Sequence, residues 1–448
     1  MKKNTQLHTL VFGLACLAAS YCTAAEKPNV LVIYMDDMGW AQPGCYGGKM
    51  APTPNIDALA AGGVRFTDGY VSACVCSPSR VGLMTGRYQA RSGHDANPNQ
   101  RPETGLALTE TTFAQRMKTA GYTTGIVGKW HLGTFNPQYM PAARGFDSSF
   151  GTMGNLGEGQ GPTFYRGLQA IADPPGAPIT SPIYARESVQ FIEANREKPW
   201  FLFLSFNAVH APHVASEKWL QKFKDLPKHD GQYAALVAEA DEAIGTVLAK
   251  LRALKLEEKT LIFLISDNGG AYANAEMGGL RGHKWFCWEG GIRVSWIAAW
   301  KGHVPGGRVS RQPVIQLDVL PTALAAAGAE VKPEWQLDGV NLLPLLEGKT
   351  DTLAPRALYF RFGVQYAVRQ GDWKLVKASK EMEPMLVNLA SDPGEQKDLS
   401  VKNPAKKQEL QTLFDTWNAS MKPPVREDLR WNGDEERKAN KKAKKQKK

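Results

Sequence analysis

Four apolar runs along the chain each end in polar residues. They lie at 30–34, within 121–133, within 199–213 and at 261–265, and they are rich in β-branched and aromatic residues. Runs of this length and composition predict buried strands. In an open α/β sheet, ligand sites form at the carboxyl ends of the strands. We therefore expect the polar residues that follow these runs to lie at one edge of a sheet.

Between these runs, apolar residues recur at intervals of three and four, as they do on one face of a helix. The pattern is clearest over 233–254, and shorter stretches at 54–63 and 110–121 end at glycine. Strands that alternate with helices predict an α/β fold, with a large, mostly parallel central sheet sandwiched by helices.

The pattern changes after about residue 330. Apolar and polar residues alternate over 357–377 around a Gly-Asp turn, which predicts an antiparallel hairpin, and 403–420 predicts a closing helix. We expect a main, catalytic domain over 26–330 and a smaller α+β subdomain with an antiparallel sheet over 331–430.

Residues 1–25 have the pattern of a secretory signal peptide. Lys2 and Lys3 precede an apolar run over 10–19, and small residues follow at 23–25. We therefore expect an exported protein, located in the periplasm, at the cell surface or in the medium. The run is too short to span a bilayer, and no other segment predicts a transmembrane helix.

The net charge of +10 is concentrated at the two ends of the chain. Eight basic residues lie within 437–448 and two are Lys2 and Lys3, which leaves residues 26–436 neutral. We expect 431–448 to be a disordered basic tail, which either aids solubility or contacts an anionic surface. Neither this charge distribution nor export favours nucleic-acid binding.

Carboxylates and an amide follow two of the predicted strands. Asp36 and Asp37 end the first run, and Asp267 and Asn268 end the last. Asp and Asn also begin many ordinary turns, but two such pairs at equivalent strand ends favour a cation site. Their hard oxygen atoms suit Ca²⁺, or less well Mg²⁺, rather than Zn²⁺.

Basic residues follow the other strands. Lys129 and His131 end one run and His210 another, while Lys284 lies in the segment "RGHKWFCWEGGIRV". Together with a divalent cation, these groups predict a positive pocket for a tetrahedral oxyanion. Sulfate or phosphate esters are substrates of that kind.

The cysteines point to chemistry rather than to a disulfide framework, because only four lie outside the signal peptide. Cys74 and Cys76 are one residue apart, and a disulfide between them would be strained. "CSPSRVGLMTGR" (76–87) matches the first signature of the formylglycine-dependent (type I) sulfatase family, within the alkaline-phosphatase-like superfamily. "GYTTGIVGKWHLG" resembles the second signature, and "DDMGW", "SDNGG" and the Lys284 segment resemble the metal and lysine blocks in the expected order. The likeness extends over roughly 28–400.

The resemblance implies that Cys76 is oxidised to formylglycine by a formylglycine-generating or anaerobic maturation enzyme, which reads Pro78 and Arg80. One hydroxyl of the hydrated aldehyde would attack sulfur, and the other would expel sulfate. Arg80 would orient the formylglycine. The resemblance also implies a set of Ca²⁺ ligands: Asp36, Asp37, residue 76, Asp267 and Asn268.

The remaining roles are assigned in the same way. By resemblance, Lys129 and Lys284 clamp the sulfate group, and His131 assists formylglycine turnover. His210 protonates the leaving oxygen, alone or with Lys284, and His213 is its rival for that role.

The chain departs from the family pattern beside the lysine. Trp285 and Phe286 stand where the family often has Gly-Thr, and Ser295 stands where a proline is usual. Trp285 either binds substrate by stacking on a sugar ring or fills the core. Cys287 either pairs with Cys74 or stays free.

We therefore predict an exported sulfatase that acts on a sulfated carbohydrate or another sulfate ester. Export, aromatic residues near Lys284 and a glycine-rich loop over 151–163, expected at the rim of the site, favour a glycan. One alternative is a phosphonate or phosphate diesterase with the same machinery. Another is a glycan-binding protein in which Cys76 is never matured.

Overall fold

The computed structural model of the chain describes residues 27–97, 105–133, 136–156, 163–271 and 275–424. The predicted signal peptide (1–25), residues 157–162 of the predicted rim loop and the predicted basic tail (431–448) lie outside the described residues. Within the described ranges, no helix is both long enough and apolar enough to cross a membrane.

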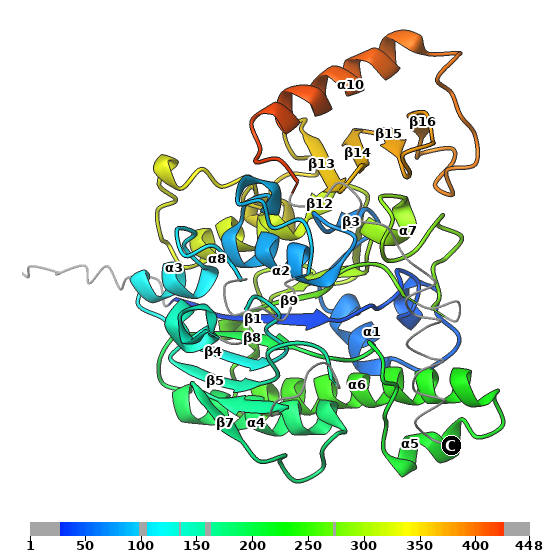
Figure 1. Cartoon of the computed structure of the whole chain (residues 1–448). Coiled ribbons are helices and arrows are strands. Elements are labelled where there is room, and N and C mark those ends of the chain that lie inside the picture. Colours follow the sequence, from blue (N-terminus) through cyan, green and yellow to red (C-terminus); the bar gives the residue numbers. More distant parts are fainter. Residues whose placement is uncertain (1–26, 98–104, 134–135, 157–162, 272–274, 425–448) are drawn as a thin grey trace, which may run out of the picture.

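A sheet that contains ten strands within the described residues lies at the centre of the molecule (Figure 1). Its order is β11 (Arg308–Ser310), β2 (Val64–Phe66), β10 (Trp296–Ala299), β9 (Thr260–Ser266), β1 (Asn29–Met35), β8 (Trp200–Ser205), β4 (Thr123–Gly128), β5 (Ser148–Gly151), β6 (Phe164–Arg166) and β7 (Gln169–Ile171). The five strands from β9 to β5 pair in parallel. The structure therefore confirms the predicted mostly parallel sheet, with antiparallel strands toward its edges.

The core lies on both faces of this sheet, and β1 shows how it is divided. The strand is buried along its length; Leu31 and Ile33 pack on one side, and Val30 and Val32 on the other. The first side is covered by α1 (Pro54–Ala61), α4 (Thr180–Asn195) and α6 (Lys228–Ala253), and the second by α2 (Cys76–Thr85), α3 (Phe113–Thr119), α8 (Val319–Ala326) and α9 (Leu343–Leu346). Two helical layers around one sheet are the predicted sandwich.

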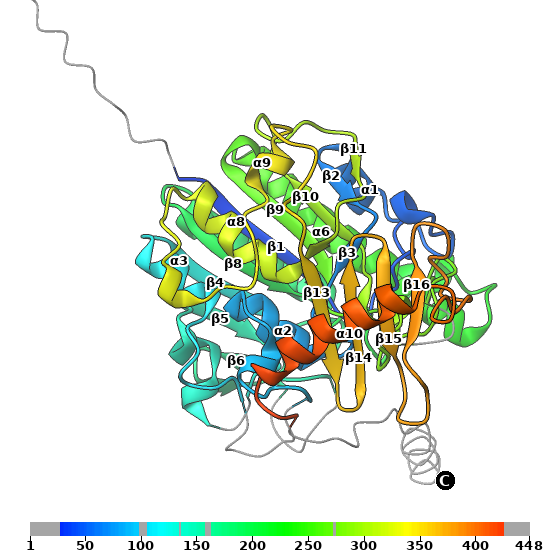
Figure 2. The same cartoon turned by 90° about the horizontal axis from the view of Figure 1, so that it is seen from above.

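A second sheet forms the C-terminal part, and it confirms the predicted antiparallel pairing. It consists of β13 (Ala357–Phe362), β14 (Gln365–Gln370), β15 (Trp373–Lys377) and β16 (Met385–Asn388). Figure 2 shows α10 (Pro404–Ala419) lying across these strands. The antiparallel sheet begins at Ala357. The segment before it still belongs to the main domain, because Leu342, Leu345 and Leu346 pack in the core of the main sheet.

Shorter elements complete the described fold. They are the two-stranded pair β3 (Gly69–Tyr70) and β12 (Val314–Ile315), α5 (Glu217–Lys222), which packs on α6, and α7 (Glu289–Ile292).

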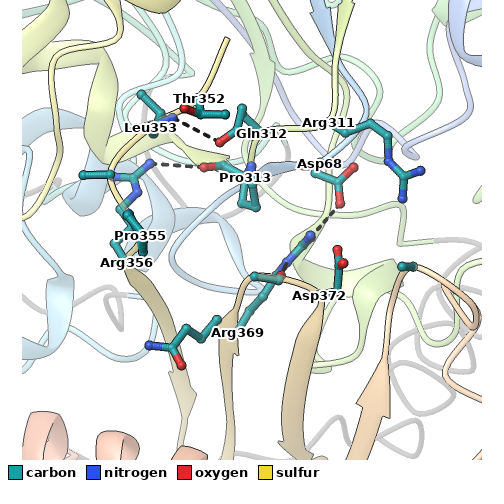
Figure 3. Close-up of a pocket in the computed structure, with 14 residues that line it drawn as sticks. Asp68, Arg311, Gln312, Pro313, Thr352, Leu353, Pro355, Arg356, Arg369 and Asp372 are labelled. Carbon is teal, nitrogen blue, oxygen red and sulfur yellow. Dashed lines mark hydrogen bonds and ion pairs between the residues drawn. The ribbon is translucent and has the colours of Figure 1, made fainter. Parts of the chain in front are cut away.

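Buried ion pairs join the C-terminal sheet to the main domain. The Nζ of Lys374, on β15, lies 2.9 Å from Glu289 and 2.8 Å from Glu395, and all three residues are fully buried. Arg369, on β14, donates to Asp68 at 2.7 Å (Figure 3). A buried charge is costly unless it is paired, so these contacts fix where the second sheet docks.

Replacing Lys374 by methionine should therefore destabilise the protein. We expect the Lys374→Met variant to lose about 3–5 kcal/mol of unfolding free energy, because Glu289 and Glu395 stay buried without their shared cation. Denaturant unfolding followed by circular dichroism measures the change. Lys377→Met, on the same strand at a half-buried position, is the control and should stay within about 0.5 kcal/mol of wild type. Equal stability of both variants would contradict this account of the docking.

Candidate active site

The carboxyl ends of β1 and β9 bring the predicted cation ligands together. The two strands pair in parallel with Met35 opposite Ser266, so the residues that follow them meet at one edge of the sheet. The result is a fully buried group in which one ligand atom from each member lies within 4.8 Å of the others: Asp36, Asp37, Cys76 and Asp267. Asn268 joins them and donates to Asp37 Oδ1 at 2.7 Å.

This donor set fits a hard divalent cation. The amide oxygen of Asn268 is buried and has no hydrogen-bond partner among the described residues. Burial and the nearby Asp36 carboxylate raise the pKa of Asp267 to about 7. A divalent cation would offset that repulsion and take the free amide oxygen as a ligand. Sulfur is not a ligand that such a cation prefers, whereas an oxygen-bearing side chain at position 76 would complete the set.

Cys76 is the first residue of α2, a helix that is buried at every position. Its thiol lies 3.4 Å from Asp36 Oδ1 and 3.9 Å from Asp37 Oδ1. Burial and the Asp36 carboxylate raise the pKa of Cys76 well above its usual value. Because the thiolate is the reactive form of cysteine, the unmodified side chain is a poor nucleophile.

Arg80 lies one turn after Cys76 and ties three strand ends together. Its Nε and Nη2 donate to Asp267 Oδ2 at 3.1 and 2.8 Å. Its Nη1 donates to Ser205 Oγ at 2.6 Å and to the carbonyl of Lys129 at 3.2 Å. The guanidinium therefore holds a predicted cation ligand and the start of the lysine segment in fixed positions.

Two buried lysines lie against the carboxylates. Lys129 Nζ is 2.5 Å from Asp36 and also donates to Asn155. Lys284 Nζ is 2.7 Å from Asp37. Burial lowers the pKa of Lys284, but the Asp37 carboxylate outweighs it and raises that pKa well above its usual value. Lys284 therefore carries its charge at neutral pH.

His210 presents one ring nitrogen to this group. Its Nδ1 donates to the carbonyl of Ala211 at 2.6 Å, which leaves Nε2 to face Asp37 at 3.7 Å. Because a carbonyl can only accept, this contact fixes the tautomer. Burial and the charge of Lys284 lower the pKa of His210, against the opposing effect of Asp37. The neutral ring therefore carries its proton on Nδ1, and a second proton taken up at Nε2 is easily given up.

The other two candidate histidines have different surroundings. His131 is buried, and burial and the charge of Lys129 hold its pKa well below the usual value, so the ring is neutral. The carbonyl of His131 accepts a hydrogen bond of 2.6 Å from Ser77. The ring of His213 packs edge-on 5.2 Å from the ring of Tyr233.

Trp285 lies beside the second lysine in an unusual backbone conformation. Its φ is +81°, its side chain is half-buried, and Lys284 Nζ lies 5.4 Å from the centre of its ring. Cys74 and Cys287 interact through their side chains nearby, but both are free thiols in this structure. Their pairing as a disulfide stays a prediction.

Sequence reasoning missed several polar residues that support the predicted ones. Ser205 is the last residue of β8. The expectation that polar residues at the carboxyl ends of strands lie in the site therefore applied to Ser205 as well. Asn155 lies in the glycine-rich stretch expected at the rim. Ser77 lies inside the cysteine signature, but no pattern indicated which groups it bonds. These residues fix orientation through hydrogen bonds that the linear sequence does not reveal.

The chain matches two protein-family models. Residues 28–329 match the model described as Sulfatase. Residues 281–420 match the model described as N-sulphoglucosamine sulphohydrolase, C-terminal. The first match contains every predicted site residue, and the second begins just before Lys284.

Known proteins resemble the chain over most of its length. It is 34% identical to N-acetylgalactosamine-6-sulfatase of Homo sapiens over 435 residues, which cover 84% of this chain and 82% of that protein. The crystal structure of Ps i-CgsB in complex with k-i-k-neocarrahexaose is 30% identical with a TM-score of 0.84, covering 90% of this chain and 95% of that chain. Phosphonate monoester hydrolase of Agrobacterium radiobacter is similar in fold, with a TM-score of 0.64 at 19% identity, covering 88% and 96% of the two chains.

Removing divalent cations should lower the melting temperature. A cation at one hundred times its Kd that binds only the folded state contributes about 2.7 kcal/mol. We expect EDTA to lower the Tm in differential scanning calorimetry and Ca²⁺ to restore it. Asp267→Asn should lose most of the Ca²⁺-dependent shift, whereas the exposed control Asp225→Asn should keep it. A wild-type Tm that responds to neither chelator nor Ca²⁺ would contradict a cation site here.

Proposed function

This chain belongs to the sulfatase family, and we propose that it is an exported enzyme that removes sulfate from a sulfated carbohydrate. Its activity is that of a sulfuric ester hydrolase. The substrate class, the nucleophile, the identity of the cation and the residue roles below are our proposals. One observation carries them: Cys76 lies in a single buried group with three carboxylates and two lysines.

We assign the nucleophile to a formylglycine made from Cys76 by a maturation enzyme. Such a residue supplies a hydrated aldehyde, with one hydroxyl to attack sulfur and a second to release sulfate. The buried thiol, with its raised pKa, supports this assignment because it would react poorly in its own right.

The charged residues around position 76 provide a place for the sulfate group. A bound Ca²⁺ would supply positive charge to activate the nucleophile and to stabilise the developing negative charge. Its proposed protein ligands, beside residue 76, are Asp36, Asp37, Asp267 and Asn268. Lys129 and Lys284 hold the sulfate oxygens from two other sides, as preformed donors aimed at developing charge.

The histidines move protons. In its imidazolium form, with the Nδ1 proton committed to a carbonyl, His210 gives the proton on Nε2 to the leaving alcohol oxygen. His131, which is buried and neutral, accepts a proton during turnover. Arg80 keeps Asp267 in place and so preserves the distance between the cation site and position 76.

A carbohydrate is the substrate class that the surroundings favour. N-acetylgalactosamine-6-sulfatase is named for a sugar, and Ps i-CgsB was crystallised with k-i-k-neocarrahexaose. Trp285 is a partly exposed aromatic residue beside Lys284, and aromatic rings suit the apolar C–H surface of a sugar ring. The secretory pattern of residues 1–25 would place the enzyme where extracellular glycans are found.

Conversion of Cys76 can be detected directly. In protein coexpressed with a maturation enzyme, we expect the peptide that contains residue 76 to be lighter by about 18 Da, the difference between CH₂SH and CHO. Cys76→Ala should abolish sulfate release without lowering the Tm, whereas the neighbouring control Cys74→Ala should remain active. More than a tenth of wild-type activity in Cys76→Ala would contradict the proposed nucleophile. A fully active protein without the mass change would do the same.

Substrate preference separates the sulfatase from a phosphonate or phosphate diesterase. We expect kcat/KM for an aryl sulfate to exceed that for the matching aryl phosphodiester by at least about tenfold, or more than 1.4 kcal/mol of transition-state stabilisation. Parallel assays of the two esters on one matured preparation measure this ratio. A ratio below one would favour the diesterase.

A further inference from the structure

The turn that contains Lys284 has a backbone conformation that its residue types do not favour. Trp285 follows with a φ of +81°, a region that bulky residues rarely adopt. A hydrogen bond of 3.1 Å from Phe286 N to the carbonyl of His283 closes the turn. Backbone of this kind persists only where the surrounding structure imposes it, so the contacts that impose it also set the position of Lys284.

Two of these contacts come from the main domain. The backbone N of Lys284 donates to the carbonyl of Gly270 at 3.0 Å, just after the cation ligands that follow β9. The backbone N of Trp285 donates to the carbonyl of Cys74 at 2.9 Å, two residues before Cys76. The turn is thus tied to the cation segment and to the nucleophile segment.

The third contact comes from the C-terminal subdomain, through the side chain of Gln365. Its Nε2 donates to the carbonyl of Trp285 at 2.9 Å, and its Oε1 accepts from the backbone N of Cys287 at 3.3 Å. The residue is only 4% exposed. One buried amide therefore bonds both a donor and an acceptor of the same turn.

An aromatic contact adds to these two hydrogen bonds. Gln365 is the first residue of β14, and its partner across the hairpin is Phe362, the last residue of β13. The ring of Phe362 lies 6.1 Å from the ring of Trp285. The tip of the β13–β14 hairpin therefore holds Trp285 by its backbone and by its side chain.

We propose that Gln365 is a positioning residue for sulfate ester hydrolysis, which acts by holding Lys284 in place. The inference rests on the proposed function, in which Lys284 holds the sulfate group. Without the two amide contacts, the turn can relax from its positive φ, and Lys284 Nζ loses its fixed place 2.7 Å from Asp37. The C-terminal subdomain then contributes to catalysis without touching the reacting atoms.

The same strand supplies a matched control. Gln370 is the last residue of β14, about 17 Å from Gln365 at roughly 3.4 Å per residue. It lines a pocket of about 680 Å³ with Arg369 and Asp372, both labelled in Figure 3, at the opposite end of β14 from Gln365. Gln370→Met makes the same chemical change on the same strand, but away from the Lys284 turn.

The first test compares methionine at the two positions. In matured protein, we expect Gln365→Met to lower kcat for sulfate release at least tenfold with less than a threefold change in KM. The loss falls on kcat because an aimed donor matters most as charge develops on the departing group. Gln370→Met should stay within twofold of wild type in both constants. Wild-type kcat in Gln365→Met would overturn the inference, and so would a loss confined to KM.

The second test is a double-mutant cycle with Lys284→Ala. If Gln365 acts through the lysine, Gln365→Met should cost less than threefold in the Lys284→Ala background. A full tenfold cost there would overturn the inference, since it would show an effect independent of the lysine. Should Gln365→Met not fold, as judged by its Tm, Gln365→Glu takes its place, because it keeps the acceptor for Cys287 and removes the donor to Trp285.

The cycle also separates this inference from the proposed function. If Lys284→Ala alone costs less than threefold, the proposed role of the lysine is wrong, and the Gln365 inference falls with it. If Lys284→Ala costs a hundredfold while Gln365→Met has no effect, only the inference about Gln365 is wrong.

Discussion

The structure depends on buried ion pairs between carboxylates and basic side chains at one edge of the central sheet. Three acidic side chains lie there without exposure to water, and uncompensated they would repel one another strongly. Each is instead paired with its own basic side chain, at 2.5 to 2.8 Å: Asp36 with Lys129, Asp37 with Lys284, and Asp267 with Arg80. These pairings place positive charge beside the three carboxylates that surround position 76, which suits an anionic ester.

The three cations come from three different parts of the fold. Arg80 lies on α2, Lys129 directly follows β4, and Lys284 lies in the turn before α7. The site therefore forms only after distant segments have docked, and any element that orients one of these segments has an influence on the chemistry. The C-terminal sheet is such an element, because it reaches the Lys284 turn through Gln365 and the main domain through Lys374.

Sequence patterns predicted the fold class and brought together most of the site, for one physical reason. Buried parallel strands produce apolar runs, and polar residues after such runs must meet at one edge, so Asp36 and Asp267 could be placed side by side without a structure. Contacts between distant segments could not be found in this way. Gln365 lies in an ordinary alternating strand, 80 residues after Trp285, and nothing in that alternation indicates a bond to an active-site turn.

The family signature and the physical chemistry of position 76 both support the proposed formylglycine there. The signature identifies Cys76 by its neighbours, whereas the structure places its sulfur among oxygen ligands and raises its pKa. A hard cation prefers oxygen there, and hydrolysis needs a nucleophile that the neutral thiol does not provide. Replacing sulfur with oxygen at this one atom meets both requirements. These requirements support our proposal that residue 76 is oxidised in the active enzyme.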